Sequence, residues 1–390
     1  MNFRLVRAQM ITGSIIGTLM YVLVKHIISQ VSYNDIGLRP KLMDDIFVRK
    51  RQLQSGHPIT ENNTAKHEVR HIAFVKVHRT GSATLKQIFL KFGHIRNLTF
   101  VLPNLRYTHT RGVISEVESL TNKNILPPPK SQPYDILCHH VIYNRNFFKA
   151  IFPKDTVYIG AVRDPISRFQ SAIYFFEPKY ILQLQGLKPL STYSRNPLLY
   201  EPTDPRNSMT NNRMAVDFGF PIHLFPDHLR NTSVNEINEY IKQLDTDFQL
   251  IVVNELFDES LVLMKRLLNW SIGDILYLRK HVTITTSRRN TLSETDILNI
   301  KDFLYLDYAL YNFAVSRIKR QIREEGDTFK KEVAFFKNVN TMFEDYCSDL
   351  KQQVSPRYFP GTDSNREFEF SHIDCLLLKM KLLNSEKNSN

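Results

Sequence analysis

The sequence predicts an α/β fold whose central sheet is mostly parallel and is covered by helices on both faces. Short apolar runs alternate with longer amphipathic segments along the middle of the chain, which is the pattern of strands joined by helical crossovers. Basic and hydroxyl-bearing residues follow two of these runs directly, at 76–84 and 163–171. Because ligands bind at the carboxyl ends of parallel strands, these two segments are the first candidates for a site.

The spacing of apolar residues places the individual elements. We expect strands at 71–76, 134–138, 156–162 and 249–254. We expect helices at 82–92, 144–151, 165–177, 207–218, 234–244, 257–268 and 295–320. Long loops are expected at 104–133 and 178–206. Residues 328–390 read as a helical and irregular appendage, in which a pairing of Cys347 with Cys375 is left open.

The first segment begins with an apolar strand, Ile72–Val75, and continues into a helical pattern after residue 84. A strand, a turn and a helix in this order aim the first N–H groups of the helix at whatever lies above the strand, and the helix dipole favours an anion there. Basic and hydroxyl side chains fill the turn: Lys76, His78, Arg79, Thr80, Ser82 and Thr84, with Gly81 and Ala83 between them. The segment therefore predicts a phosphate cradle. It lacks the lysine of the GxxxxGK[ST] pattern, so it is not of the ATP-binding type.

The second segment begins with another buried strand, Val157–Val162, and places Arg163 at its end. Asp164 is a plausible N-cap and Pro165 suits the first turn of the following helix. Arg163 and Ser171 are then able to reach one phosphate, the first with a bidentate guanidinium and the second with a hydroxyl. The plain alternative is an Arg–Asp surface pair at a helix start.

These two elements in this order resemble the Golgi sulfotransferases that use 3′-phosphoadenosine 5′-phosphosulfate (PAPS), and within them the galactose-3-O-sulfotransferase family. The resemblance is carried by Lys76–Thr84, followed by Phe92-Gly93 and Asn97–Thr99, and by Cys138–Val141, Asn254–Leu263 and Asp274–Tyr277. The similarity covers about residues 70 to 315. Two positions depart from the family pattern, with His139 where asparagine is expected and Arg79 where lysine is common, and both bear on acceptor choice.

The resemblance implies a P-loop-like sulfotransferase fold and transfer of a sulfuryl group to the 3-hydroxyl of galactose on a glycolipid or glycoprotein. It implies PAPS as co-substrate and no metal. The expected cofactor-binding residues on the 5′ side are Lys76, Thr80, Gly81, Ser82 and Thr84, and those at the 3′-phosphate are Arg163 and Ser171. Arg79 and Ala83 are also expected to bind the cofactor. One alternative is a uronosyl 2-O-sulfotransferase of glycosaminoglycans. Another is an anchored glycan-binding protein without turnover, which the presence of Lys76 and Arg163 disfavours.

Sulfuryl transfer needs a base for the hydroxyl and a stabiliser for the leaving phosphate. Lys76 suits the leaving group. His140, which ends a strand beside the cofactor strand, is the first candidate for the base, and His78 inside the cradle is the second. Glu255 is a further candidate, either for an acceptor hydroxyl or for orienting a histidine, although an acid at a helix start is also common. Three polar residues, Asn211, Asn212 and Arg213, are suggested as contacts to sugar or cofactor without a pattern to support them. Asp307 and Tyr311 are expected to be packing residues.

Composition limits the other classes of protein. The chain has 390 residues, a formal charge of +12 and 42% hydrophobic residues, which suits a globular protein with an anionic ligand. A basic protein also suits nucleic acid, but no zinc-finger pair or RNP-like aromatic run occurs. Three cysteines are too few for a disulfide scaffold.

The first thirty residues predict a membrane anchor. Met10–Val24 is apolar or small, follows Arg4 and Arg7, and reaches a spanning length if Ile27 and Ile28 are included. A cleaved signal peptide is the alternative. We expect a cytoplasmic tail at 1–8, a signal anchor at 9–29, a luminal stem at 30–68, a catalytic domain at 69–325 and an extension at 326–390. Sequons at Asn62, Asn97, Asn231 and Asn269 fit a luminal body, so a type II membrane protein is expected. The resemblance implies the Golgi as its location, and a homodimer is left open.

Overall fold

The computed structural model describes residues 67–108, 112–129, 132–182, 184, 188–226, 233–279, 292–348, 355–362 and 365–386. The chain divides into two units, 1–60 and 61–390, and every described residue belongs to the second. The expected anchor at 9–29, nearly all of the expected stem and the sequons at Asn62 and Asn231 lie outside the described residues. Among the described residues, no helix combines the length and the apolar character needed to cross a membrane.

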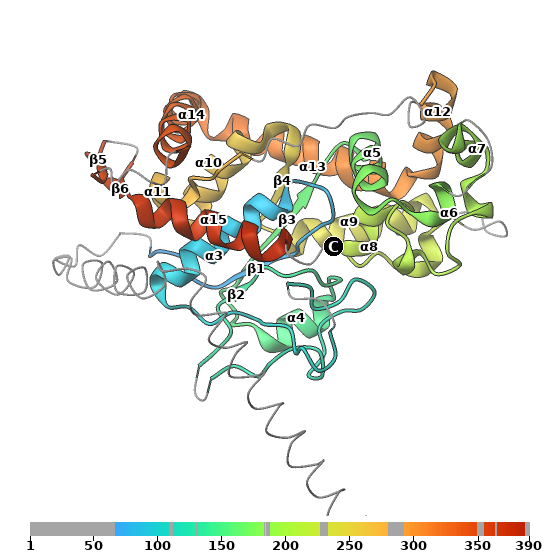
Figure 1. The fold of residues 1–390 in the computed structure, drawn as a ribbon, viewed down its shortest axis with the longest axis horizontal. Helices are drawn as coiled ribbons and strands as arrows, with labels where there is room; N and C mark the ends of the chain where they lie inside the picture. The colour runs from blue at the N-terminus through green and yellow to red at the C-terminus, as the bar shows by residue number, and fades with distance from the viewer. Residues whose placement is uncertain are drawn as a thin grey trace, which may run out of the picture. The chain divides into compact units, whose positions relative to one another are not determined.

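The sheet that organises the described residues has four strands, and all of them are parallel (Figure 1). The strands are β1 (Ile72–Phe74), β2 (Ile136–Leu137), β3 (Val157–Val162) and β4 (Leu250–Val253). Their order is β2-β1-β3-β4, so the first strand lies in the interior of the sheet. All four contain buried apolar residues, which is typical of a parallel sheet covered on both faces.

Helices and a small hairpin make up most of the remainder. The helices after β1 and β2 are α3 (Ser82–Arg96) and α4 (Arg145–Ile151), and those between β3 and β4 are α5 (Pro165–Phe176), α6 (Lys179–Leu182), α7 (Pro189–Arg195), α8 (Arg213–Asp217) and α9 (Val234–Asp247). After β4 come α10 (Phe257–Leu268), α11 (Ile272–Ile275), α12 (Glu294–Phe303), α13 (Tyr305–Glu324), α14 (Gly326–Ser348) and α15 (His372–Glu386). The hairpin strands are β5 (Arg357–Phe359) and β6 (Phe368–Phe370), which pair antiparallel.

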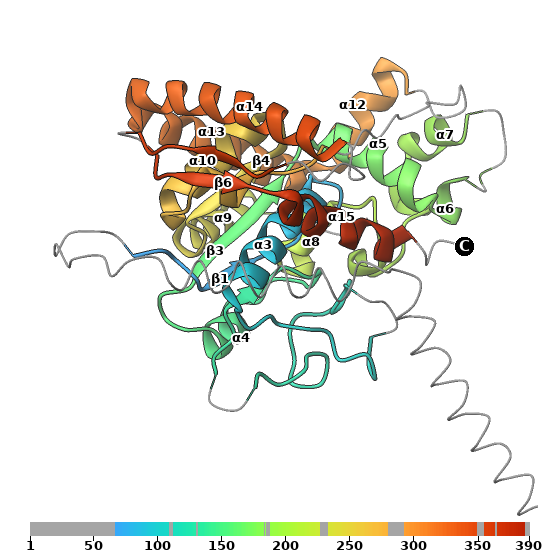
Figure 2. The ribbon, with the colours of Figure 1, turned by 60° about the vertical axis from the view of Figure 1, so that its left-hand side comes forward.

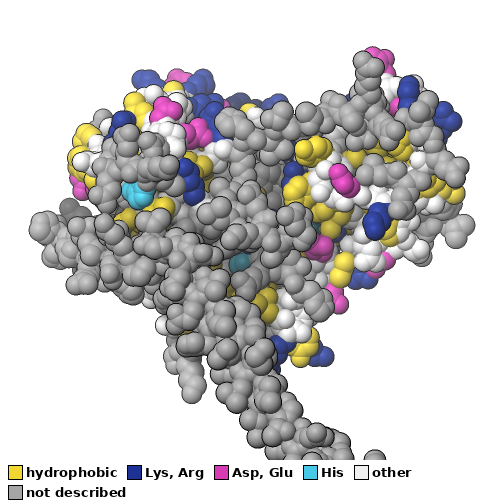
Figure 3. All heavy atoms as spheres, viewed as in Figure 1, with side chains coloured by type: hydrophobic (Ala, Val, Ile, Leu, Met, Phe, Trp, Pro, Cys, Tyr) yellow, Lys and Arg dark blue, Asp and Glu magenta, His cyan; other side chains and the backbone are white. Residues whose placement is uncertain are grey.

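Two groups of helices flank the sheet (Figures 1 and 2). One contains α3, α10 and α11, with α14 packed on α10 and α15 on α3. The other contains α8, α9 and α13, and α13 contacts both β3 and β4. Helices α5, α6, α7 and α12 gather beside this body around a small apolar core of their own. On the described surface around α5, α6 and α12, apolar side chains are interspersed with acidic and basic ones (Figure 3).

Three of the expected element boundaries were wrong. The helix expected at 207–218 is only Arg213–Asp217, because Asn212 adopts a left-handed conformation with φ of 45°. The helix expected at 295–320 is two helices, α12 and α13. They are separated at Leu304, and the Asn212 side chain accepts from the N–H groups that open the second one. The expected loop at 178–206 contains α6 and α7, which are too short to show a clear apolar period.

The C-terminal elements are fastened to the rest of the body by a disulfide and a buried ion pair. Cys347 at the end of α14 is bonded to Cys375 on α15, which answers the pairing that the sequence left open. Lys265 on α10 lies 2.6 Å from Glu332 on α14. The appendage expected at 328–390 therefore packs on the helices that follow β4.

The strand order defines where a ligand is expected. The chain leaves β1 and returns on opposite sides of it, to β2 on one side and later to β3 on the other. Such a switch point opens a crevice at the carboxyl ends of the two diverging strands. The residues that directly follow β1 and β3 are the two basic segments singled out from the sequence, and Figure 2 shows these strands side by side behind α3.

Candidate functional site

The segment after β1 forms a tight turn that presents unpaired N–H groups. Arg79 and Gly81 both adopt positive φ angles, 64° and 76°, and α3 begins directly afterwards. The N–H groups of residues 80 to 83 find no acceptor in the part of the chain that the structure describes. A run of open N–H groups at the start of a fifteen-residue helix is a binding site for an anion.

The hydroxyl groups of the turn have a different role from the one expected. Thr80 Oγ1 donates to the carbonyl of Val77 at 3.1 Å, and Ser82 Oγ donates to the same carbonyl. Both side chains are buried. These two hydroxyls therefore hold the shape of the turn, and the anion donors of this segment are its main-chain groups.

Position 81 requires a glycine because of its backbone conformation and because of a close neighbouring atom. Its φ of 76° is left-handed, and a Cβ at this position would lie 2.6 Å from Asn254 Oδ1. Asn254 directly follows β4, so the turn after β1 lies against the end of a strand that is not its neighbour in the sheet. A side chain at position 81 would close this approach and strain the cradle.

Lys76 and His140 form a contact at the ends of β1 and β2. Lys76 Nζ contacts His140 Nε2, and the other ring nitrogen, Nδ1, lies 2.9 Å from the Lys76 carbonyl. Burial, followed by the nearby charge of Lys86, lowers the pKa of Lys76 to about 7. Burial and the adjacent His78 and Lys76 hold the pKa of His140 well below its usual value. His140 is therefore a neutral ring whose two nitrogens both face Lys76.

His78 lies in a different arrangement. Its Nδ1 atom is 2.8 Å from Asp217 Oδ2, and its main-chain N–H donates to the same oxygen. Its Nε2 atom is buried and has no hydrogen-bond partner. The ring stacks on His140 with centroids 3.8 Å apart. Of the two histidines, only His78 combines an orienting carboxylate with an open nitrogen.

A buried arginine fixes the carboxylate that orients His78. Arg213 places Nε and Nη2 3.1 and 2.8 Å from Asp217 Oδ1, and its remaining N–H groups donate to main-chain carbonyls. Burial is the largest influence on Asp217 and would raise its pKa. The charge of Arg213 and the hydrogen bonds from His78 outweigh it and bring the pKa to about 2. Asp217 is thus an anion near neutral pH.

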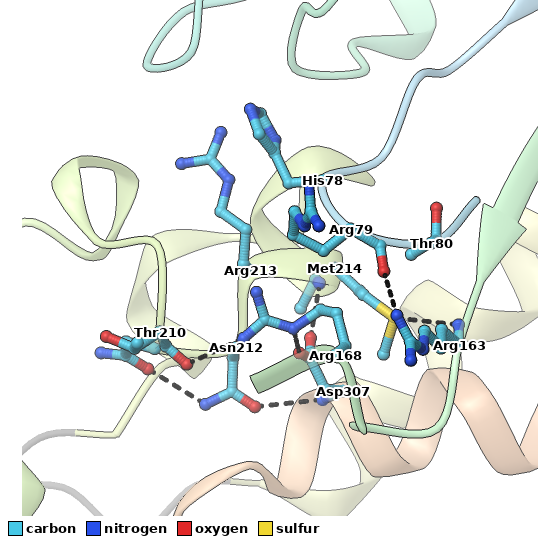
Figure 4. A network of polar contacts seen from close by, with 12 residues as sticks. His78, Arg79, Thr80, Arg163, Arg168, Thr210, Asn212, Arg213, Met214 and Asp307 are labelled. Carbon is cyan, nitrogen blue, oxygen red and sulfur yellow. Dashed lines mark hydrogen bonds and ion pairs between the residues drawn. The ribbon is translucent and has the colours of Figure 1, made fainter. Parts of the chain in front are cut away.

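Two more cations, Arg79 and Arg163, lie on the other side of the cradle (Figure 4). Arg79 Nε donates to Ser171 Oγ at 3.0 Å, and its guanidinium lies over the Phe175 ring. Arg163 Nη1 donates to the main-chain carbonyl of Arg79 at 3.4 Å. Burial, then the positive charges of Arg163 and Arg168, lower the pKa of Arg79. An anion placed between Arg79 and Arg163 would relieve this repulsion.

Glu255 was expected to contact an acceptor or orient a histidine, and the second of these is wrong. Its carboxylate accepts from the N–H of Asp164 at 2.9 Å and from the Tyr311 hydroxyl at 3.3 Å. It therefore braces the start of α5 near Arg163, while the carboxylate that orients a histidine is Asp217.

The three polar residues suggested for sugar or cofactor contact are also structural. Asn211, Asn212 and Arg213 are almost fully buried and bond to the main chain or to each other. Asp307 is buried too, as expected for a packing residue, and it accepts from the N–H of Ala215 at 2.8 Å. Figure 4 shows Asn212 and Asp307 below Arg79, while the Arg213 side chain rises beside His78.

Two residues that lie beside His78 were not predicted from the sequence. Asp217 lies on the short helix α8, where its i,i+4 spacing from Arg213 would have indicated an ion pair but not the contact with His78. Glu116 lies in the region read as a loop, and its Oε1 atom is 3.7 Å from His78 Nε2. No pattern in the sequence marks it.

The comparisons with known proteins agree with one another. A family model described as Galactose-3-O-sulfotransferase matches residues 4–357. Galactosylceramide sulfotransferase of Homo sapiens is 26% identical over 293 residues, which is 72% of this chain and 64% of that protein. Galactose-3-O-sulfotransferase 3 of Mus musculus is 27% identical over 268 residues, covering 67% of this chain and 59% of its own. The chain thus spans less than two thirds of the length of these relatives.

Proposed function

The chain belongs to the galactose-3-O-sulfotransferase family, and we propose that it transfers a sulfuryl group from PAPS to the 3-hydroxyl of a galactose residue on a glycolipid or glycoprotein glycan. The names of the relatives support galactose as the acceptor sugar. The uronosyl 2-O-sulfotransferase alternative has no such support. A membrane-anchored protein with its catalytic body in the Golgi lumen remains part of the proposal.

The donor set fits the two anionic ends of PAPS. Open N–H groups at residues 80 to 83 and the ammonium of Lys76 suit the 5′-phosphosulfate, while Arg79, Arg163 and Ser171 suit the 3′-phosphate. Both groups of donors lie at the switch point of the sheet. When bound, PAPS supplies the sulfuryl group and a phosphate leaving group.

We assign the base to His78, although the sequence ranked His140 first. The carboxylate of Asp217 keeps the proton of the neutral ring on Nδ1, so Nε2 carries the lone pair. That nitrogen is buried and unbonded, which leaves it available to take the proton of a hydroxyl. Asp217, which Arg213 holds in place, then stabilises the imidazolium that forms.

Lys76 serves the leaving phosphate, and His140 positions Lys76. A neutral imidazole accepts from the lysine ammonium and thereby aims it, without carrying a charge that would compete for the anion. The low pKa of Lys76, about 7, shows that its charged form is poorly compensated in the free protein. An anion restores that compensation, and its charge grows as the sulfuryl group departs.

One observation carries the proposal: an open, carboxylate-oriented imidazole lies directly beside an anion cradle at the end of β1. The test is to incubate the full chain with labelled PAPS and a panel of terminal galactosides and glycosaminoglycans, and then to locate the sulfate by NMR. We expect label on O-3 of terminal galactose. Label on a uronate would support the alternative enzyme, and nucleotide binding without any transfer would indicate a binding protein.

A further inference from the structure

Glu116 places a carboxylate beside the open nitrogen of His78. Its Oε1 atom lies 3.7 Å from His78 Nε2, which is too far for a direct hydrogen bond. The His78 side chain is 4% exposed, whereas the Glu116 side chain is 42% exposed. Glu116 is therefore the more accessible of the two groups to an incoming molecule.

The backbone around Glu116 is held firmly. The N–H groups of Ile114 and Ser115 donate to the carbonyl of His140 at 2.9 and 3.1 Å, which extends the sheet edge beyond β2. Ser115 Oγ accepts from the N–H groups two and three residues later and closes a turn. The carbonyl of Glu116 accepts from Arg213 Nη2 at 2.6 Å. The same arginine thus fixes Asp217 on one side of His78 and Glu116 on the other.

The carboxylate of Glu116 is ionised in this environment. A glutamate side chain that is 42% exposed is an anion near neutral pH. An ionised carboxylate accepts hydrogen bonds and donates none. The group beside it must therefore bring its own proton, as a sugar hydroxyl does.

We propose that Glu116 accepts a hydrogen bond from a second hydroxyl of the acceptor sugar, on the ring carbon next to the hydroxyl that His78 deprotonates. This inference rests on the proposed function and deepens it. Hydroxyl oxygens on neighbouring ring carbons lie roughly 3 Å apart, the span of one hydrogen bond. Two acceptors 3.7 Å apart, His78 Nε2 and Glu116 Oε1, match such a pair.

This arrangement makes Glu116 a specificity-determining residue. A sugar with two adjacent free hydroxyls satisfies both acceptors, whereas a sugar lacking one leaves a carboxylate unpaired in a partly desolvated place. The negative charge of Glu116 also opposes acceptors that carry carboxylates or sulfates close to the reacting hydroxyl. For reaction at O-3 of galactose, the second hydroxyl is the one at C-2 or C-4.

The test combines substrate and protein variants. Initial rates are measured for the full chain and for Glu116→Ala on a β-galactoside and on its 2-deoxy and 4-deoxy analogues. With the unchanged protein, we expect one analogue to lose about 10- to 100-fold in kcat/KM, the loss typical of a hydrogen bond to a charged group. With Glu116→Ala, the parent sugar loses a similar factor and that analogue loses nothing further.

Controls separate this outcome from a general loss of structure. Glu118→Ala changes an exposed carboxylate two residues away and is expected to leave the ratio between the three sugars unchanged. Binding of the desulfated nucleotide, measured by calorimetry, is expected to be the same for Glu116→Ala and the unchanged protein. If Glu116→Ala loses the same factor on all three sugars, the assignment of Glu116 is overturned while the proposed function stands. If the unchanged protein turns over no galactoside, both are overturned.

Discussion

The Nδ1 atom of His78 lies 2.8 Å from the Oδ2 atom of Asp217, and both side chains are almost fully buried. The two residues are 139 positions apart in the chain. Asp217 is itself held by a buried arginine, so the carboxylate has little freedom to turn. The imidazole is therefore fixed in both orientation and tautomer.

Asp217→Asn is expected to lower kcat by about 10²- to 10⁴-fold, because an amide does not hold the proton on Nδ1 or stabilise the imidazolium. The variant also leaves Arg213 without its buried counter-charge, so the melting temperature should fall as well. Nucleotide affinity by calorimetry distinguishes the two effects. A variant that binds the nucleotide normally and also turns over normally would show that Asp217 has no part in catalysis.

The affinity for the desulfated nucleotide is expected to fall as the pH rises through about 7. Free Lys76 has a pKa of about 7, and a bound anion raises that pKa, so binding takes up a proton above pH 7. The limiting slope from this one group is about tenfold per pH unit. Lys76→Met is the matched control. The phosphate groups of the nucleotide ionise in the same way for both proteins, so only the contribution of the lysine is removed. Equal slopes for both proteins would contradict the assignment.

Arg163→Ala is expected to weaken binding of the desulfated nucleotide by about 2–4 kcal/mol, the cost of removing one side of a charge-assisted pair. Arg320→Ala, an exposed arginine on α13, is the control and should bind normally. Calorimetry of both variants compares them directly. Unchanged affinity in Arg163→Ala would remove Arg163 from the 3′-phosphate site.

Gly81→Ala is expected to reduce both stability and nucleotide affinity. The left-handed φ of 76° costs alanine about 1–2 kcal/mol, and its Cβ would meet Asn254 Oδ1. Adding Asn254→Ala removes the contact but keeps the backbone strain, so the double variant should recover only part of the loss. Thermal unfolding measures the stability, and calorimetry measures the nucleotide affinity. A Gly81→Ala protein with unchanged values of both would contradict the tight approach of the cradle to β4.

The fold was predictable because its signals are local. The apolar runs at β1, β3 and β4 stand out in the sequence, and each is followed by a helix whose first residues are recognisable, as with Asp164 and Pro165. The parallel sheet and the two basic segments at its carboxyl edge follow from that alternation. A local pattern does not show a turn such as the one at Asn212, whose left-handed backbone is stabilised by bonds to α13.

The site was only partly predictable for a related reason. Lys76, Arg79 and Arg163 lie just after the ends of β1 and β3, and Ser171 lies on the helix that follows β3, so their proximity follows from the topology of the sheet. The partners of His78 come from α8 and from the loop before β2, and only the packed structure brings them together. His140 was ranked above His78 because these contacts of His78 cannot be read from the sequence.

The central claim is that His78 takes the proton of the acceptor hydroxyl. It is tested most directly by measuring kcat for His78→Ala and His140→Ala side by side, with nucleotide affinity measured on each protein. The account predicts that His78→Ala loses at least about 10²-fold in kcat and still binds the nucleotide, while His140→Ala loses less in kcat. A nearly normal kcat for His78→Ala beside an inactive, nucleotide-binding His140→Ala would contradict it.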